Sequence, residues 1–191
     1  LHNILALGGD PPQGRDDHVP AELRHRHASD LVEQIAAMNR GLWLDADGRP
    51  GREGVKTGFG TGVAGFPEVH PSDYDEALGF GASMEGYLGY LKAKVDAGAD
   101  YVVGQMVFDA ALHLDFVEAA RRAGIEVPII AGILPFDRWR QVERFIGPEL
   151  RISMPEEVAG RLSAAASEKD EAQIAEEHLA GVVRSLLDAG V

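Results

Sequence analysis

The 191-residue sequence contains no cysteine. It can therefore form no disulfide, no thiolate nucleophile, and no cysteine-ligated zinc or iron–sulfur site. Positive charge is also scarce, because 18 lysines and arginines stand against 31 aspartates and glutamates, giving a net charge of −13. Nucleic-acid binding needs a basic face, so this balance argues against a nucleic-acid partner. A small phosphorylated molecule held by a few local cations remains compatible with it.

Long apolar runs and targeting signals are missing as well. An apolar run such as Val127–Leu134 is far too short to span a bilayer, and no basic segment leads into an apolar one as in a secretion signal. We therefore predict a cytoplasmic protein with no membrane partner. With 45% apolar and 26% charged residues, the chain has the composition of a globular domain of ordinary size.

Short apolar runs alternate with helical patterns along the chain. Strands are predicted at Asn3–Leu7, Gly60–Phe66, Tyr101–Phe108 and Val127–Ile133. One helix is predicted to begin at Ala28, and a second is predicted to end at Gly98. Further helices are predicted over Ala110–Ala123, Arg138–Phe145, Pro155–Ala166 and Gln173–Ala189, and a hairpin excursion is predicted at 40–58. This alternation predicts an α/β fold with a parallel sheet and right-handed crossovers. The strands are too few to close a (β/α)8 barrel, which needs about 250 residues, so a small open sheet and a partial barrel both fit the pattern.

Polar side chains follow the predicted strands at the points where they end. Asp10 comes after the first strand, Glu68 and His70 come after the second, and Gln105 lies within the third. In parallel α/β folds this edge of the sheet is where ligands bind. Asp10 stands between glycines and prolines, which suits either a turn or a stiff ligand-binding loop. A buried Gln105 amide needs either a backbone partner or a ligand.

Glu68 and His70 leave two interpretations open. They are two residues apart, so in an extended strand they share a face and could form a metal pair or an ion pair. Without cysteine or a second pair of histidine and carboxylate ligands, we favour the structural contact and predict no metal. Lys94, near the end of a predicted helix, is typical of a cation that complements the helix dipole. The sequence has no Rossmann, P-loop or nucleophile-elbow motif.

Several stretches occur in a fixed order: Leu5–Pro12, Ala64–Pro71, Leu91–Asp100, Gln105–Asp109 and Val127–Pro135. Together they resemble the methylenetetrahydrofolate reductase family, and the resemblance covers essentially the whole chain. The resemblance implies a (β/α)8 TIM barrel that reduces 5,10-methylenetetrahydrofolate to 5-methyltetrahydrofolate by way of FAD, with NADH or NADPH as hydride donor. It also implies that residues 1–191 form one partial barrel, roughly strands four to seven, and that the catalytic glutamate lies upstream.

The resemblance assigns roles to individual residues. Asp10 is the candidate catalytic residue, beside both flavin and folate. The residues expected to bind FAD are Gly9, Asp10, His27, Ala28, Phe66, His70, Pro71 and Lys94. Those expected to bind the folate substrate are Asp10, Gln105, Gln141 and Phe145. The chain departs from the family pattern at Gly8, which replaces an arginine, at His27, which replaces a tyrosine, and at Tyr87 and Tyr90, which replace polar residues.

These departures keep other functions open. The alternatives are a flavin-independent reductase of the same family, a metal-dependent barrel lyase that uses Glu68 and His70, and a barrel module that binds without catalysis. NADH and NADPH are equal alternatives for the hydride donor. A homo-oligomer is compatible with the sequence as well.

Overall fold

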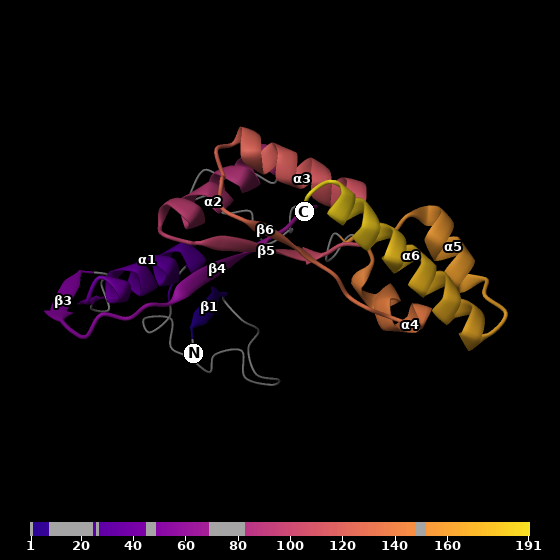
Figure 1. Ribbon diagram of the computed structural model, residues 1–191, viewed down its shortest axis with the longest axis horizontal. Helices are drawn as coiled ribbons and strands as arrows, with labels where there is room; N and C mark the ends of the chain where they lie inside the picture. Colours follow the sequence, from indigo (N-terminus) through magenta and orange to yellow (C-terminus); the bar gives the residue numbers. More distant parts are fainter. Residues whose placement is uncertain (1, 8–24, 26, 45–48, 69–82, 148–151) are drawn as a thin grey trace.

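The computed structural model describes residues 2–7, 25, 27–44, 49–68, 83–147 and 152–191, and its fold is of the predicted α/β class (Figure 1). The elements in chain order are β1 (Asn3–Ala6), α1 (Ala28–Asn39), β2 (Leu42–Leu44), β3 (Pro50–Glu53), β4 (Gly60–Gly65), α2 (Met84–Asp96), β5 (Tyr101–Met106), α3 (Ala110–Arg122), β6 (Ile129–Gly132), α4 (Trp139–Val142), the 3-10 helix η4 (Glu143–Phe145), α5 (Glu156–Ser163) and α6 (Glu168–Asp188). The antiparallel pair β2–β3 lies within the excursion at 40–58. No helix in the described ranges is long and apolar enough to cross a bilayer.

The main sheet has four parallel strands in the order β1-β4-β5-β6. Each strand contributes one residue to a row that pairs across the sheet, and all four residues are buried: Ala6, Val63, Val102 and Ile129. Successive side chains of a strand point to opposite faces. The neighbours Leu5 and Ile130 therefore belong to the other face, and they are 42% and 49% exposed.

The helices α1, α2 and α3 cover the face that carries this buried row. Their apolar side chains join the row in one core, to which α1 contributes Val32, α2 contributes Tyr87, Leu88 and Leu91, and α3 contributes Phe116. Figure 1 shows α2 and α3 on the same side of the sheet. A doubly wound sheet has helices on both faces, whereas a barrel has them on the outer face alone. The arrangement is therefore that of part of a (β/α)8 barrel.

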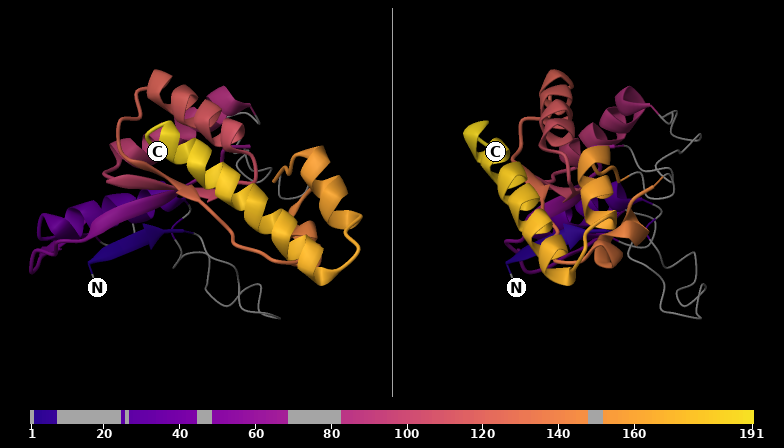
Figure 2. Two further views of the ribbon diagram at one scale, coloured as in Figure 1. Left: turned by 45° about the vertical axis from the view of Figure 1, so that its right-hand side comes forward. Right: turned by 90° about the vertical axis from the view of Figure 1, so that its right-hand side faces the viewer.

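A second core lies at the other end of the described chain. The helices α4, α5 and α6 gather there in both views of Figure 2. Their apolar side chains surround Phe108, at the end of β5, and Phe136, which follows β6. The two phenylalanine rings meet edge to face with 5.7 Å between centroids. This core therefore fixes the three C-terminal helices to the strand ends.

The last helix differs from the prediction at its start. α6 begins at Glu168, whereas the apolar spacing predicts a start at Gln173. Ser167 caps the helix, because its hydroxyl oxygen accepts a hydrogen bond from the Asp170 backbone N–H at 3.3 Å. The added turn holds Glu168, Asp170 and Glu171, whose charges suit the positive end of the helix dipole. Because this first turn holds acidic residues, the spacing of apolar residues did not indicate that the helix begins there.

Candidate active site

The predicted site residues come from separate parts of the fold. Gly9, Asp10, His70 and Pro71 lie outside the described residues. The predicted residues that the structure describes are His27, Ala28, Phe66, Lys94, Gln105, Gln141 and Phe145. They belong to three places, which are the region between α1, α2 and the end of β4, the end of β5, and the α4–η4 segment.

The end of β4 is held by two side chains from α2. The Phe66 backbone N–H donates to the Tyr87 hydroxyl oxygen at 2.7 Å, and the Lys94 ammonium donates to the Ala64 carbonyl at 2.9 Å. Tyr87 is fully buried and Lys94 is 3% exposed. The Lys94 nitrogen also lies 4.7 Å from the centre of the Tyr90 ring and 6.0 Å from that of Tyr87. We call Tyr87, Tyr90 and Lys94 the tyrosine–lysine cluster.

His27 and Ala28 stand at the start of α1. The His27 backbone N–H donates to the Asp30 carboxylate at 2.9 Å, which helps to begin the helix. The His27 ring meets the Tyr90 ring edge to face, with 6.4 Å between centroids. Phe66 meets Tyr87 in the same manner at 6.3 Å. The tyrosine–lysine cluster therefore connects His27 with Phe66.

Gln105 lies in a β-bulge at the end of β5. Val103 pairs with Ile130 of β6, but the next pair is Met106 with Gly132, so β5 has one more residue than β6 over this stretch. The Gln105 side-chain oxygen accepts a hydrogen bond from the Met106 backbone N–H at 2.9 Å. In the described part of the chain, its amide NH₂ group has no partner. The bond thus fixes the side-chain oxygen and the direction of the NH₂ donor.

Phe66 and Gln105 leave neighbouring strands side by side. Gly65 of β4 pairs with Gly104 of β5, and the next residue of each strand is the predicted one. Both side chains are half-buried. An aromatic residue and an amide residue therefore follow neighbouring strands at the carboxyl edge of the sheet, where parallel α/β folds bind ligands.

Gln141 and Phe145 lie in the α4–η4 segment, where Gln141 is exposed and Phe145 is half-buried. The Gln141 side-chain oxygen accepts hydrogen bonds from the backbone N–H groups of Asp137 and Arg138, at 3.0 Å and 3.1 Å, and so caps α4. Phe145 packs against the second core, and the Arg144 guanidinium lies 4.6 Å from the centre of its ring. The predicted folate contacts of both residues remain predictions, and the structure adds a local role for Gln141.

Glu68 connects the end of β4 with a distant segment. One of its carboxylate oxygens accepts from the Ser153 backbone N–H at 2.8 Å, and the other accepts from the Ser153 hydroxyl. Within the described residues, no group of three or more His, Asp or Glu side chains is arranged to hold a metal ion. The described geometry therefore gives the metal-dependent alternative no support, and its partner residue His70 lies outside the described residues.

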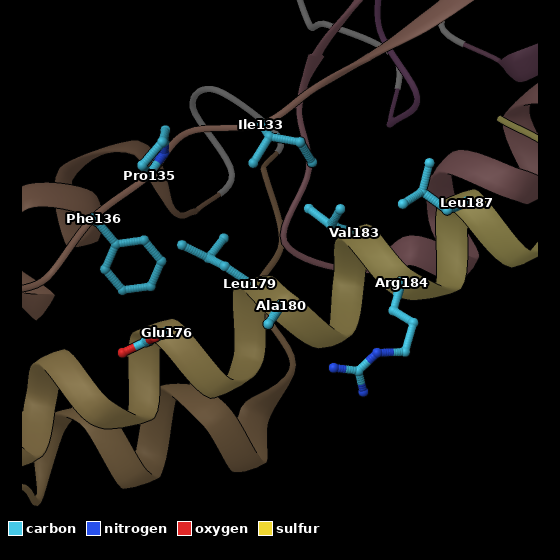
Figure 3. A pocket seen from close by; sticks show the side chains of 9 residues that line it. All are labelled: Ile133, Pro135, Phe136, Glu176, Leu179, Ala180, Val183, Arg184 and Leu187. Carbon is cyan, nitrogen blue, oxygen red and sulfur yellow. The ribbon is translucent and has the colours of Figure 1, made fainter.

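A groove of about 640 Å³ lies between the segment after β6 and one side of α6 (Figure 3). Its apolar lining side chains are Ile133, Pro135, Phe136, Leu179, Ala180, Val183 and Leu187, and its charged ones are Glu176 and Arg184. None of the predicted site residues that the structure describes lines it. A pterin needs several polar partners, so this apolar surface is not the candidate active site.

The profile of the family described as "Methylenetetrahydrofolate reductase" matches residues 1–191. The chain belongs to this family. It is 41% identical over 150 residues to "Methylenetetrahydrofolate reductase (NADH) 1" of Arabidopsis thaliana, covering 77% of this chain and 22% of that protein. It is 38% identical over 165 residues to the protein of the same name from Zea mays, with 85% and 25% covered. It is 32% identical over 191 residues to "Probable methylenetetrahydrofolate reductase (NADPH)" of Caenorhabditis elegans, with 100% and 25% covered. The chain thus spans about a quarter of the length of these relatives.

Two features of this chain were not predicted from the sequence. Tyr87 and Tyr90 stood out as departures, but no role was predicted for them. Their spacing to Lys94 is i, i+3, i+7, which places all three on one helix face and was a usable signal. Ser153 gave no signal, because its partner Glu68 is 85 residues away in the sequence.

Proposed function

We propose that the protein carrying this chain reduces 5,10-methylenetetrahydrofolate to 5-methyltetrahydrofolate, with NADH or NADPH as hydride donor. The observation that carries the proposal is the family match, which extends over all of residues 1–191. The names of the relatives, which include both nicotinamides, support a reduced nicotinamide as the electron source. A cytoplasmic location belongs to the same proposal.

In the proposed net reaction, C4 of the nicotinamide loses a hydride equivalent, and a C–H bond forms at the methylene carbon of the folate. The bond between that carbon and N10 breaks, and N10 takes up a proton. Two electrons move with the hydride, so the nicotinamide is oxidised and the folate is reduced. The protein contributes by holding the two reactants at the correct distance and orientation.

Gln105 is the described residue best suited to orient the folate. Its oxygen is fixed by the Met106 N–H, so its NH₂ group is held in one direction and can donate to an acceptor of the pterin. Phe66, on the neighbouring strand, offers a ring against which the ligand can pack. Of the described carboxylates that follow these strands, Glu68 accepts at both oxygens from Ser153, and Asp109 accepts from the Ala111 backbone N–H. We therefore assign no proton donor among the described residues.

FAD, which the resemblance implies, fits the described residues only in part. His27, Ala28 and Phe66 could line a flavin nucleotide. Lys94, the cation predicted for its phosphates, is 3% exposed and donates to the Ala64 carbonyl. A phosphate binds a cation that it can reach, so the donor set does not suit the phosphate end of FAD at this point. This observation favours a second candidate, direct hydride transfer from NAD(P)H to the folate without a flavin.

Spectra and steady-state kinetics of the purified full-length protein separate these candidates. Methylenetetrahydrofolate-dependent oxidation of NADH or NADPH, with 5-methyltetrahydrofolate as product, is the result expected for the proposed function. Flavin absorbance bands and parallel double-reciprocal lines would support the FAD route. A colourless, active protein with intersecting lines would support direct transfer. Folate binding without turnover would refute the reductase and leave a binding module.

A further inference from the structure

The backbone at the end of β4 extends beyond its pairing with β1. The Gly60 N–H donates to the His2 carbonyl, whereas the Thr61 carbonyl accepts from Asp100 next to β5. Hydrogen-bonding direction alternates along a strand, so the even-numbered residues of β4 face β1. The pairing of β1 with β4 runs from Asn3↔Gly60 to Ala6↔Val63. The later groups on that side need other partners.

Two side chains from α2 supply such partners. The Lys94 ammonium donates to the Ala64 carbonyl, and the Tyr87 hydroxyl accepts from the Phe66 N–H. Ala64 and Phe66 are two residues apart, so both are on the β1-facing side of the strand. Tyr87 and Lys94 are seven residues apart on α2, which places them on one face of the helix, two turns apart. Together they continue the hydrogen bonding of the sheet by one further step.

The environment of Lys94 suits an internal contact better than a cofactor phosphate. The side chain is 3% exposed, and two aromatic rings of the tyrosine–lysine cluster lie within 6.0 Å of its nitrogen. Lys92, on the same helix, shows the contrast, because its side chain is 34% exposed and pairs with Asp96. A cation buried among tyrosine rings is stabilised by their electron-rich faces and by a carbonyl.

We propose that Lys94 and Tyr87 are positioning residues that hold the end of β4, and that Lys94 is not a phosphate ligand. They determine the position of Phe66, where the chain leaves the sheet. They also affect Glu68, two residues later, which is hydrogen-bonded to Ser153. The proposal rests on the proposed function only in the claim that Phe66 borders the ligand. The brace between α2 and β4 stands on the contacts alone.

Hydrogen exchange on the full-length protein tests the brace without any need for turnover. Tyr87→Phe removes the hydroxyl and keeps the ring. We expect the Phe66 amide to exchange about tenfold faster, since one hydrogen bond is lost. The amides of Val102 and Val103 in β5 should keep their rates. Uniform acceleration at all these amides, or no change at Phe66, would overturn the positioning role.

Substitutions of Lys94 separate a brace from a phosphate ligand. Lys94→Met and Lys94→Arg are compared with Lys92→Met, and NADPH and FAD are titrated separately at low and high salt. If Lys94 acts as a brace, both Lys94 variants should unfold at a lower temperature than the parent, and Lys92→Met should not. The affinities for NADPH and FAD should change by less than about twofold, and their salt dependence should stay the same. Arginine does not rescue, because its larger planar head does not fit the enclosed position.

The opposite pattern would show that Lys94 binds phosphate. In that case Lys94→Met would lose nucleotide affinity, Lys94→Arg would restore it, and both variants would unfold like the parent. The two proposals fail in distinguishable ways. A protein with normal brace behaviour and no folate reduction would refute the proposed function, whereas an active reductase rescued by Lys94→Arg would refute the brace.

Discussion

His113 of α3 is a polar side chain in an apolar position. It is fully buried, and neither ring nitrogen has a hydrogen-bond partner among the described residues. A Cβ atom added at Gly104 would lie 3.3 Å from the Cε1 atom of His113. The centroid of the His113 ring lies 6.3 Å from that of the Phe116 ring. Burial penalises the charged ring and so lowers the pKa of His113 below its ordinary value of 6.5. The neutral ring fills space that an apolar ring would fill without unsatisfied nitrogens.

We expect His113→Phe to raise the free energy of unfolding by about 1 kcal/mol at neutral pH, because it removes buried polar atoms without partners. The parent should also lose stability as the pH falls below 6.5, since the unfolded chain then binds a proton that the folded chain resists. The variant should lack this contribution. Urea unfolding of parent and variant, at about pH 7.5 and about pH 5.5, measures both effects. Equal losses of stability on acidification would contradict the prediction.

Gln105 offers a substitution that separates its two hydrogen-bonding groups. Gln105→Glu keeps an acceptor for the Met106 N–H and removes the NH₂ donor, whereas Gln105→Leu removes both. If the donor holds the folate, both variants should lower kcat/KM for methylenetetrahydrofolate by about tenfold to a hundredfold, as expected for one lost hydrogen bond at a buried site. Only Gln105→Leu should also lower the unfolding temperature. An unchanged folate kcat/KM in Gln105→Glu would restrict Gln105 to its structural bond.

At the scale of single elements, the β5 bulge depends on close approach of two strands. A Cβ at Gly132 of β6 would lie 2.4 Å from the Gly104 carbonyl oxygen and 2.9 Å from the Gln105 carbonyl carbon. Such distances are shorter than any normal contact, and the atoms met are backbone atoms that cannot turn away. Gly132 therefore permits the bulge that aims Gln105.

Gly132→Ala should lower the free energy of unfolding by about 2 kcal/mol or more, because the strands must separate to admit the methyl group. Gly181→Ala in α6 is the matched control, since a Cβ there meets nothing within 4 Å. That variant should gain about 0.5–1 kcal/mol from the reduced backbone entropy of the unfolded chain. Denaturant unfolding of both variants checks the pair. Equal stability changes in the two would show that the strand contact at Gly132 is not tight.

The sequence predicted the elements better than their junctions. The apolar runs at Asn3–Leu7 and Val127–Ile133 are strong signals, and both contain strands of the sheet. The bulge had no signal, because it depends on how β5 pairs with β6. The enclosure of Lys94 was equally hidden, since it requires Tyr87 and the end of β4 to meet in space. Periodic sequence patterns indicate local secondary structure, whereas these features depend on contacts between residues that are distant in the sequence.

At the scale of the whole molecule, the described chain leaves apolar surface along both sides of its sheet. Leu5 and Leu7 at the β1 side are 42% and 48% exposed, and Ile130 at the β6 side is 49% exposed. Val183 and Leu187, which line the groove of Figure 3, are 38% and 66% exposed. An unpaired strand edge beside exposed apolar side chains is a site of self-association.

We therefore expect the 191-residue chain on its own to self-associate. The double variant Val183→Lys with Leu187→Lys should associate at least about tenfold more weakly, because burying two lysines in an apolar interface is costly. The lysines make the net charge less negative than −13, so weaker association would not come from greater repulsion. Val55→Lys is the control, because Val55 is 82% exposed and lies outside the groove. Sedimentation velocity over a range of concentrations gives the association constants. A parent chain that stays monomeric throughout, or a double variant that associates as strongly as the control, would show that this groove is not a self-association surface.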